Sequence, residues 1–369
     1  MRCYLSLFGM ILITAFRAFQ RIHLKGTNVC SSVNIVRLRN YSLALLICFV
    51  GLNSCGAPPK ESLPDQVAYQ APEIPPLASE ERLVMVDRDV AIRDYFAYMA
   101  GLVSQWDSLV PYSLDEHLLV WANSWIIDSL ANTDYYHLMN RGVFQEDLQA
   151  LIILRKGDLL RIPDSLFASL LLEARAATIL DLNIPEYKLR IYEGDCLLHT
   201  FLVRVGQNRT RHLAMAGRDV DLRTHTGVGS IVRINRNPRF VNPRDNKEYE
   251  STLRDDGRRT GLPLVPWIEP ELDGQRFGQL IHPTTNPATL GKPYSNGCVG
   301  VGEGDMWRIY YHAPLGTKVQ FRYQLEVVDE AGDTLLLSHI YPDYRPTTAD
   351  KAPSPLLVCS CGPVGEEVN

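Results

Sequence analysis

The chain has 369 residues, 46% apolar and 21% charged, which is the composition of a globular protein long enough for two domains. Residues 1–54 carry six Lys and Arg and no acidic residue, so the rest of the chain holds 31 basic against 42 acidic residues. A body this acidic, with no basic stripe interleaved with aromatic residues, argues against binding of nucleic acid.

The cysteines and histidines form no pattern typical of a metal site or a disulfide framework. The sequence contains eight cysteines and nine histidines but no CxxC, HExxH or HxH motif. We therefore expect no metal and no cofactor. Cys359 and Cys361 lie in a polar, Pro-rich stretch that begins after Ser338, which predicts a loose tail.

Residues 1–54 have the features of a leader segment. Arg37–Asn40 is positive, and Leu43–Leu52 gives ten apolar residues, too few to span a bilayer but suited to a secretory signal. The junction Leu52-Asn53-Ser54-Cys55-Gly56 resembles a bacterial lipobox, which implies acylation of Cys55 and an anchor facing the periplasm, at the outer membrane. Two alternatives stay open: a chance cysteine after an ordinary signal peptide, or a transmembrane segment within residues 1–34.

A linker and a helical region follow the leader. Residues 55–79 are rich in Pro, Ala, Glu and Gln, which predicts an extended linker. Within residues 80–176, Val90–Ser104 has helical spacing of apolar residues, and Ser113–Glu116 forms a capping box before a second helix through Leu130. Asp164 is expected to cap a further helix through Ala177.

A short strand pair is expected within this helical region. Ile152–Leu154 and Leu159–Pro163 flank the polar turn Arg155–Asp158, a pattern that predicts a small hairpin. A segment of this kind also ends LysM peptidoglycan-binding modules, but a structural hairpin is the preferred interpretation.

The chain becomes rich in predicted strands from Ala177 onward. The loop-rich stretch 235–273 carries many Arg, Asp and Pro residues and is expected to form a flap or cleft wall, and Asp305 is expected to cap a helix through Tyr311. The expected strands are Ile179–Asn183, Tyr187–Tyr192, Leu197–Val205, Ile231–Ile234 and one opening at Leu315–Val319.

The stretch Ile281–Val301 carries the candidate chemistry. It reads as two short strands joined by a Pro- and Gly-rich loop, with His282 on the first and Cys298 at the start of the second. A thiol reacts as its thiolate, so Cys298 needs a base, and we expect His282 to supply it and to lower the thiol pKa. Gly297 permits a tight turn whose amide groups could face a developing oxyanion.

The spacing from His282 to Ser295-Asn296-Gly297-Cys298 and the apolar Val299 resembles the active-site signature of the YkuD-type L,D-transpeptidases. Two positions depart from it: Asn296 stands where the family often has a second histidine, and Gly300 where it usually has arginine. Upstream residues also resemble the opening strands of that family, namely Leu189, Tyr192, Gly194 and Val205-Gly206. The resemblance covers about residues 177–323.

The resemblance implies an α+β fold, with a β-rich, sandwich-like mixed sheet at 177–325, a mainly helical region before it, and a strand and tail at 326–369. It implies a transferase that acts on peptidoglycan stem peptides through an acyl-enzyme on Cys298, with amides at Gly297 and Cys298 holding the oxyanion. Candidate substrate contacts are Tyr294, Ser295 and Asn296.

The acceptor and the assembly are left open by the sequence. Transfer to a second stem peptide would give a 3–3 cross-link, and transfer to water would make an L,D-carboxypeptidase. A catalytically weak, anchored peptidoglycan-binding lipoprotein is a further alternative, and the oligomeric state is not predicted. Two other families with a Cys–His pair fit less well. Sortases need an arginine a few residues after the cysteine, whereas the first arginine after Cys298 is Arg308. NlpC/P60 peptidases place the cysteine before the histidine in the chain, whereas here His282 comes first.

Overall fold

The computed structural model describes residues 82–242, 245–328, 332–345 and 350. The predicted leader, the linker at 55–79, the acylation site Cys55 and the pair Cys359 and Cys361 lie outside these residues. Within the described ranges, no helix is both long enough and apolar enough to cross a membrane.

The region before residue 177 is mainly helical, as expected, but its second helix differs from the prediction. That helix begins at Glu116, because the Asp115 carboxylate rather than Ser113 accepts the free N–H of Leu118 at 2.7 Å. It also ends at Trp121, so the predicted run to Leu130 is split in two. The helices of this region are α3 (Ile92–Trp106), α4 (Glu116–Trp121), α5 (Trp125–Ala131), α6 (Tyr135–Asn140) and α7 (Ser165–Ala176).

The hairpin predicted around Arg155–Asp158 is wrong in its pairing. The two strands exist as β3 (Ile152–Leu154) and β4 (Leu159–Ile162), but they do not pair with each other. Instead β3 pairs with β2 (Val90–Ala91) and β4 pairs with β1 (Arg82–Met85), both antiparallel. The polar turn therefore joins two separate ladders.

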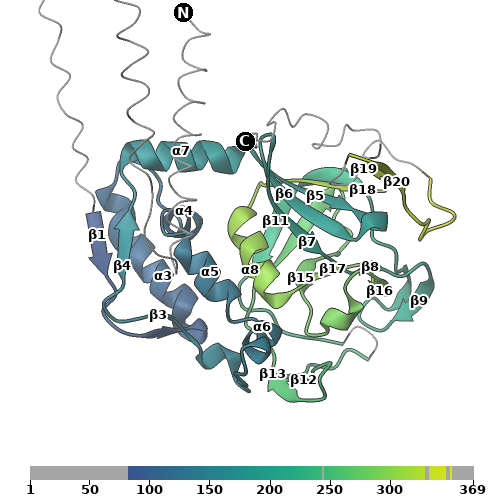
Figure 1. Ribbon diagram of the computed structural model, residues 1–369, viewed down its shortest axis with the longest axis horizontal. Coiled ribbons are helices and arrows are strands. Elements are labelled where there is room, and N and C mark those ends of the chain that lie inside the picture. Colours follow the sequence, from purple (N-terminus) through teal and green to yellow (C-terminus); the bar gives the residue numbers. More distant parts are fainter. Residues whose placement is uncertain (1–81, 243–244, 329–331, 346–349, 351–369) are drawn as a thin grey trace, which may run out of the picture. The chain divides into compact units, whose positions relative to one another are not determined.

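An eight-stranded mixed sheet forms the second half, which confirms the predicted fold class (Figure 1). Its order is β17-β15-β14-β11-β18-β5-β6-β7. Two neighbouring pairs, β15 with β17 and β5 with β18, are parallel, and the others are antiparallel. The strands are β5 (Thr178–Asn183), β6 (Lys188–Glu193), β7 (Cys196–Leu202), β11 (Gly227–Asn235), β14 (Trp267–Leu272), β15 (Ile281–Pro283), β17 (Val299–Val301) and β18 (Lys318–Arg322).

The stretch predicted as a flap, residues 235–273, is only partly a flap. Its last part is β14, a strand of the large sheet between β11 and β15. The part that lies outside that sheet carries the short hairpin β12 (Ser251–Leu253) and β13 (Arg259–Gly261). The remaining two-stranded pairs are β8 (Val205–Gly206) with β16 (Pro293–Ser295), β9 (Thr210–Leu213) with β10 (Arg218–Asp221), and β19 (Glu326–Val328) with β20 (Thr334–Leu336).

Helix α8 (Glu303–His312) lies between the helical region and the sheet and joins them (Figure 1). It follows β17 directly, and its N-cap is Gly302, three positions before the expected Asp305. Trp307 of α8 and Tyr95 of α3 are fully buried in one hydrophobic core that also contains sheet residues such as Phe321. The described residues belong to one compact unit, so the domain boundary at 176/177 stays a prediction.

A buried polar cluster fixes the contact between the helical region and α8. Glu116 of α4 accepts hydrogen bonds from the hydroxyls of Tyr310 (3.1 Å) and Tyr311 (2.9 Å) and pairs with Arg236 at 3.1 Å. Burial raises the pKa of this carboxyl. Because α8 continues from β17, these bonds brace the strand that carries the candidate nucleophile.

The described part of the segment after Ser338, expected to be a loose tail, is packed against the body around Tyr341. Tyr341 is 1% exposed, and its hydroxyl donates to the Gly206 carbonyl at 2.7 Å and accepts the Thr224 amide at 3.1 Å. Its aromatic ring stacks on Tyr323, as does that of Tyr344, and these rings supply apolar surface within a polar, Pro-rich stretch. This part of the tail therefore covers the base of the nucleophile loop.

Candidate active site

His282 and Cys298 are brought to neighbouring strands by a parallel ladder. Ile281 pairs with Val299 and His282 with Gly300, and the Val299 amide donates to the Leu280 carbonyl at 2.8 Å. Successive side chains of a strand alternate between its two faces, so residues 280, 282, 298 and 300 share one face. The histidine and the thiol thus lie on the same side of the sheet edge.

The His282 ring has one nitrogen committed to the backbone. Its Nδ1 lies 2.8 Å from the Pro283 carbonyl oxygen, which can only accept, so Nδ1 carries the proton and Nε2 holds the free lone pair. Burial and, to a smaller extent, the neighbouring Arg204 cation lower the His282 pKa to about 4, against the opposing effect of the hydrogen bond to Pro283. The ring is therefore a neutral base at pH 7.

The Cys298 thiol is also neutral in the free protein, contrary to the expectation from sequence. Burial raises its pKa, and this effect outweighs the Leu280 amide, which donates to Sγ at 3.4 Å, and the Arg204 cation. The expectation assumed a protonated histidine beside the sulfur, but His282 is itself too buried to hold that charge. The structure shows a neutral thiol beside a neutral base.

The turn before Cys298 is held from both sides. Ser295 is 7% exposed; its Oγ donates to the Cys298 carbonyl at 2.5 Å and accepts the Gly297 amide at 3.2 Å. Gly297 has φ +110, and a Cβ there would lie 2.8 Å from Gln279 Nε2. Thr224 Oγ1 donates to the Gly297 carbonyl at 2.9 Å. Only glycine fits this position.

These bonds bear on the predicted oxyanion donors. The Gly297 amide is already engaged by Ser295, whereas the Cys298 amide makes no hydrogen bond to the described part of the chain. Of the candidate substrate contacts, Ser295 shapes the turn, Asn296 is half-buried, and Tyr294 is 58% exposed. Their contact with a substrate stays a prediction.

The strand-rich half of the chain matches a known protein family. Residues 177–321 match the family model described as "YkuD: L,D-transpeptidase catalytic domain". This segment is therefore similar to the L,D-transpeptidase catalytic domains of the YkuD family. Over 132 residues the chain is 30% identical to "Putative L,D-transpeptidase YkuD" of Bacillus licheniformis. The aligned residues make up 36% of this chain and 57% of that relative.

Solved L,D-transpeptidase structures resemble the chain weakly. The domain from Xylanimonas cellulosilytica (its residues 123–326) is 14% identical, with 64% of this chain and 97% of that chain covered and a TM-score of 0.29. An L,D-transpeptidase from Mycobacterium smegmatis is 12% identical, with 40% and 59% covered and a TM-score of 0.27.

The matched domain holds two polar side chains at the site that sequence reasoning missed. Gln279 is 8% exposed; its Oε1 accepts the His225 amide at 2.9 Å, and its Nε2 donates to the Arg223 carbonyl at 2.8 Å, which ties the turn to the preceding loop. Arg204 lies beside Gly300. Neither Gln279 nor Arg204 lies in a recognisable sequence motif. The only feature of the sequence that could have indicated a role in the site is the position of Gln279, three residues before His282.

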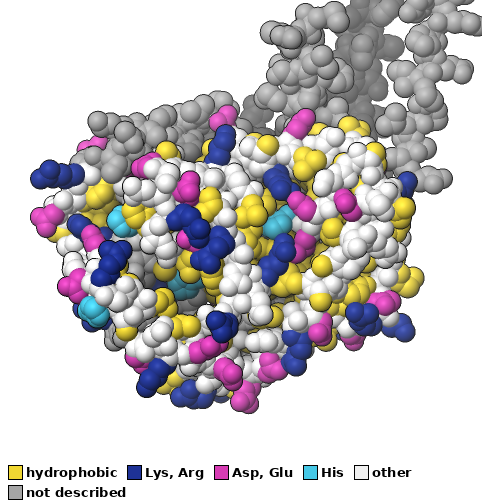
Figure 2. All heavy atoms as spheres, turned by 180° about the vertical axis from the view of Figure 1, so that it is seen from behind, with side chains coloured by type: hydrophobic (Ala, Val, Ile, Leu, Met, Phe, Trp, Pro, Cys, Tyr) yellow, Lys and Arg dark blue, Asp and Glu magenta, His cyan; other side chains and the backbone are white. Residues whose placement is uncertain are grey.

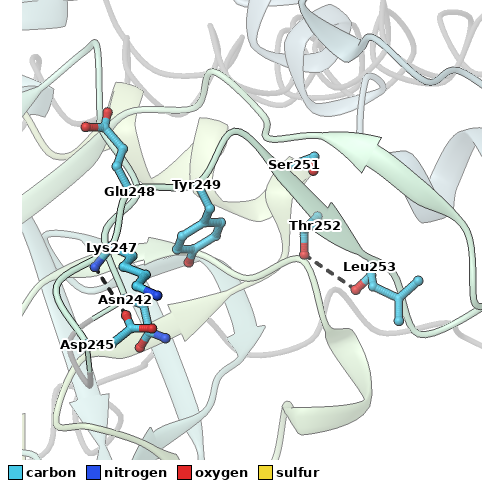
Figure 3. Close-up of a pocket in the computed structure, with 8 residues that line it drawn as sticks. All are labelled: Asn242, Asp245, Lys247, Glu248, Tyr249, Ser251, Thr252 and Leu253. Carbon is cyan, nitrogen blue, oxygen red and sulfur yellow. Dashed lines mark hydrogen bonds between the residues drawn. The ribbon is translucent and has the colours of Figure 1, made fainter.

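A cavity of about 510 Å³ lies in the loop that leads into the flap hairpin (Figure 3). Its walls include Lys247, Tyr249 and Leu253, and the Tyr249 ring points into it in the close-up. Tyr249 lies close enough to Arg204 to affect its pKa. Tyr249 therefore links the lining of this cavity to Arg204 through an electrostatic interaction.

The hairpin itself is fastened to the loop after His282. Thr252 Oγ1 lies 3.2 Å from Thr285 Oγ1, and the Asp255 carboxylate accepts the Ala288 amide at 2.9 Å. Arg254 forms a buried ion pair with Glu303 at the start of α8. The hairpin is thus fixed to the loop that follows β15, the strand that carries His282.

Two further observations concern the ligands that the site could take. Within the described ranges, no group of three or more His, Cys, Asp and Glu side chains is arranged to hold a metal ion. Figure 2 shows basic and acidic side chains interspersed over the face it presents.

Proposed function

We propose that this protein is a cysteine L,D-transpeptidase that acts on peptidoglycan stem peptides and forms 3–3 cross-links outside the cytoplasm. The observation that carries the proposal is the parallel pairing of β15 with β17, which sets His282 and Cys298 on one face within the matched domain. The chain covers 57% of the curated relative, so substrate and acceptor are part of the proposal.

The chemistry begins from the neutral pair. His282 Nε2 takes the Cys298 proton as the sulfur attacks the carbonyl before the terminal D-alanine, and the resulting imidazolium returns that proton to the leaving amine. The Leu280 amide stabilises charge on the sulfur, and the Cys298 amide is the available donor for the oxyanion. The acyl group of the thioester then passes to the side-chain amine of a second stem; the C–S bond breaks, and His282 carries the amine proton to the Cys298 sulfur.

The competing function is a catalytically weak, anchored peptidoglycan-binding protein. The raised pKa of the Cys298 thiol favours it, because few thiolates exist at neutral pH in the free protein. General-base transfer removes this objection, since the proton moves to His282 only as the bond forms.

The test is turnover by the purified full-length protein on a disaccharide-tetrapeptide, followed by mass spectrometry with and without an acceptor stem. A cross-linked dimer supports transpeptidation, and a tripeptide product alone supports the L,D-carboxypeptidase. No product, together with no labelling of Cys298 by a thioester-forming probe, would refute the enzymatic function and leave the binding protein.

A further inference from the structure

Arg204 is a half-buried cation beside the nucleophile without a carboxylate partner. Its only side-chain hydrogen bond to the described residues runs from Nη1 to Thr289 Oγ1 at 3.2 Å, and its Nε is buried without a partner. It forms no ion pair within those residues. By contrast, the buried arginines of this protein are paired with acids: Arg190 with Glu186, Arg254 with Glu303, and Arg322 with Asp181.

The backbone fixes where this guanidinium lies. The Arg204 amide donates to the Gly300 carbonyl at 2.8 Å, and the Gly300 amide donates to the Arg204 carbonyl at 3.0 Å. Gly300 is two residues after Cys298 and pairs with His282 across the ladder. A Cβ at Gly300 would lie 2.4 Å from Arg204 Nε, so the absent side chain makes the space that the arginine uses.

We propose that Arg204 is the anion-binding residue of this site and takes a carboxylate of the peptide next to the bond that Cys298 attacks. A buried cation is costly unless an anion or several acceptors compensate it, and the described protein supplies one hydroxyl. A guanidinium matches a carboxylate with two parallel N–H donors. The inference deepens the proposed function and rests on it for the identity of the peptide.

The recognition can be measured at the thiol without any turnover. Iodoacetate and iodoacetamide alkylate the same sulfur and differ in carrying a carboxylate or a neutral amide. The rate ratio of the two reagents at Cys298, read by peptide mass spectrometry on the full chain, cancels any change in thiolate population. Cys196 in β7, a half-buried free thiol, serves as the internal reference.

The variants are Arg204→Gln, Arg204→Lys, and Arg209→Gln as a matched control at an exposed arginine. We expect the iodoacetate-to-iodoacetamide ratio at Cys298 to fall about tenfold or more in Arg204→Gln, because a hydrogen bond to a charged group has that weight. Arg204→Lys should keep most of the ratio and Arg209→Gln all of it. An unchanged ratio in a folded Arg204→Gln would overturn the proposal.

A second measurement on the unmodified protein covers the case in which Arg204→Gln does not fold. N-acetyl-D-alanine should protect Cys298 from iodoacetamide, and N-acetyl-D-alaninamide should not. Equal protection by both, or by neither, would refute carboxylate recognition.

Turnover then identifies which carboxylate is bound. Two peptides are compared, one amidated at the terminal residue and one amidated at the other carboxylate of the tetrapeptide. In the wild type, one of these two amidations should lower kcat/KM about tenfold. The same amidation should have little effect on kcat/KM in Arg204→Gln. Full activity on both amidated peptides would overturn the inference and leave the transpeptidase. A responsive alkylation ratio without turnover would instead overturn the transpeptidase and leave the anion site.

Discussion

The ionisation state of His282 decides between two descriptions of the dyad, and pH-dependent stability distinguishes them. In the structure the folded pKa of His282 is about 4, against 6.5 for the free side chain. The unfolded chain therefore binds more protons between these values, so this residue makes stability fall as pH drops from 6.5 to 4.

The magnitude follows from the difference between the two pKa values. At 1.36 kcal/mol for each pH unit, the full contribution is about 3 kcal/mol. The residue as a whole is only part-buried, so solvent screening reduces this to about 2 kcal/mol. If His282 were instead an imidazolium paired with a thiolate, its folded pKa would lie above 6.5, and the sign would reverse.

The assay is urea unfolding of the full chain at pH 7 and pH 4.5, for the wild type and for His282→Asn. We expect the variant to lose less stability on acidification than the wild type, by about 2 kcal/mol. His137→Asn, at an exposed histidine of α6, is the control and should behave as the wild type. A variant that loses more stability than the wild type would refute the neutral pair and restore the ion pair expected from sequence.

Three other substitutions test the remaining parts of the site. Cys298→Ser should abolish turnover, by at least about a thousandfold, while circular dichroism stays native, because a hydroxyl is a poor nucleophile with a weak base; near-native activity would contradict the assignment. Gly300→Ala places a Cβ 2.4 Å from Arg204 Nε and should cost about 1–3 kcal/mol in unfolding free energy and displace the guanidinium, with a loss of kcat/KM; unchanged stability and activity would show that the space is not shared. Cys55→Ala should release the protein from membranes on fractionation, whereas retention of the variant would point to residues 1–34 as the anchor.

The sequence predicted the catalytic half of the fold well, because its signals are local. Alternating apolar residues and the Glu193–Asp195 turn predict strands that the structure shows as β5, β6 and β7. The family resemblance was carried by a motif of seventeen consecutive positions, and residues 177–321 match that family. Such signals depend on residues that are close in sequence, so contacts with the rest of the chain change them little.

The errors lie where partners are distant in sequence. The strands around Arg155–Asp158 were paired with each other, since one true partner, Arg82–Met85, carries no distinctive pattern and the other, Val90–Ala91, was taken as the start of a helix. Ser113 was preferred as a cap over Asp115, although either side chain can accept an N–H. Tyr341 was placed in a loose tail, because nothing near it shows that Gly206 and Thr224 offer partners for its hydroxyl.

The same reason hid Arg204 and gave the wrong sign for the thiol pKa. The loop seen in isolation contains a histidine, a cysteine and a missing arginine, which suggests a charged pair with weakened substrate positioning. The folded sheet adds burial, which neutralises both members of the pair, and a cation from residue 204 that fills the space at Gly300. A neutral dyad beside an uncompensated guanidinium favours an anionic peptide over water as the first partner, because the carboxylate repays the burial of the cation before any proton moves. Carboxylate binding at Arg204 and proton transfer from Cys298 to His282 then follow in that order at the same buried edge of the sheet.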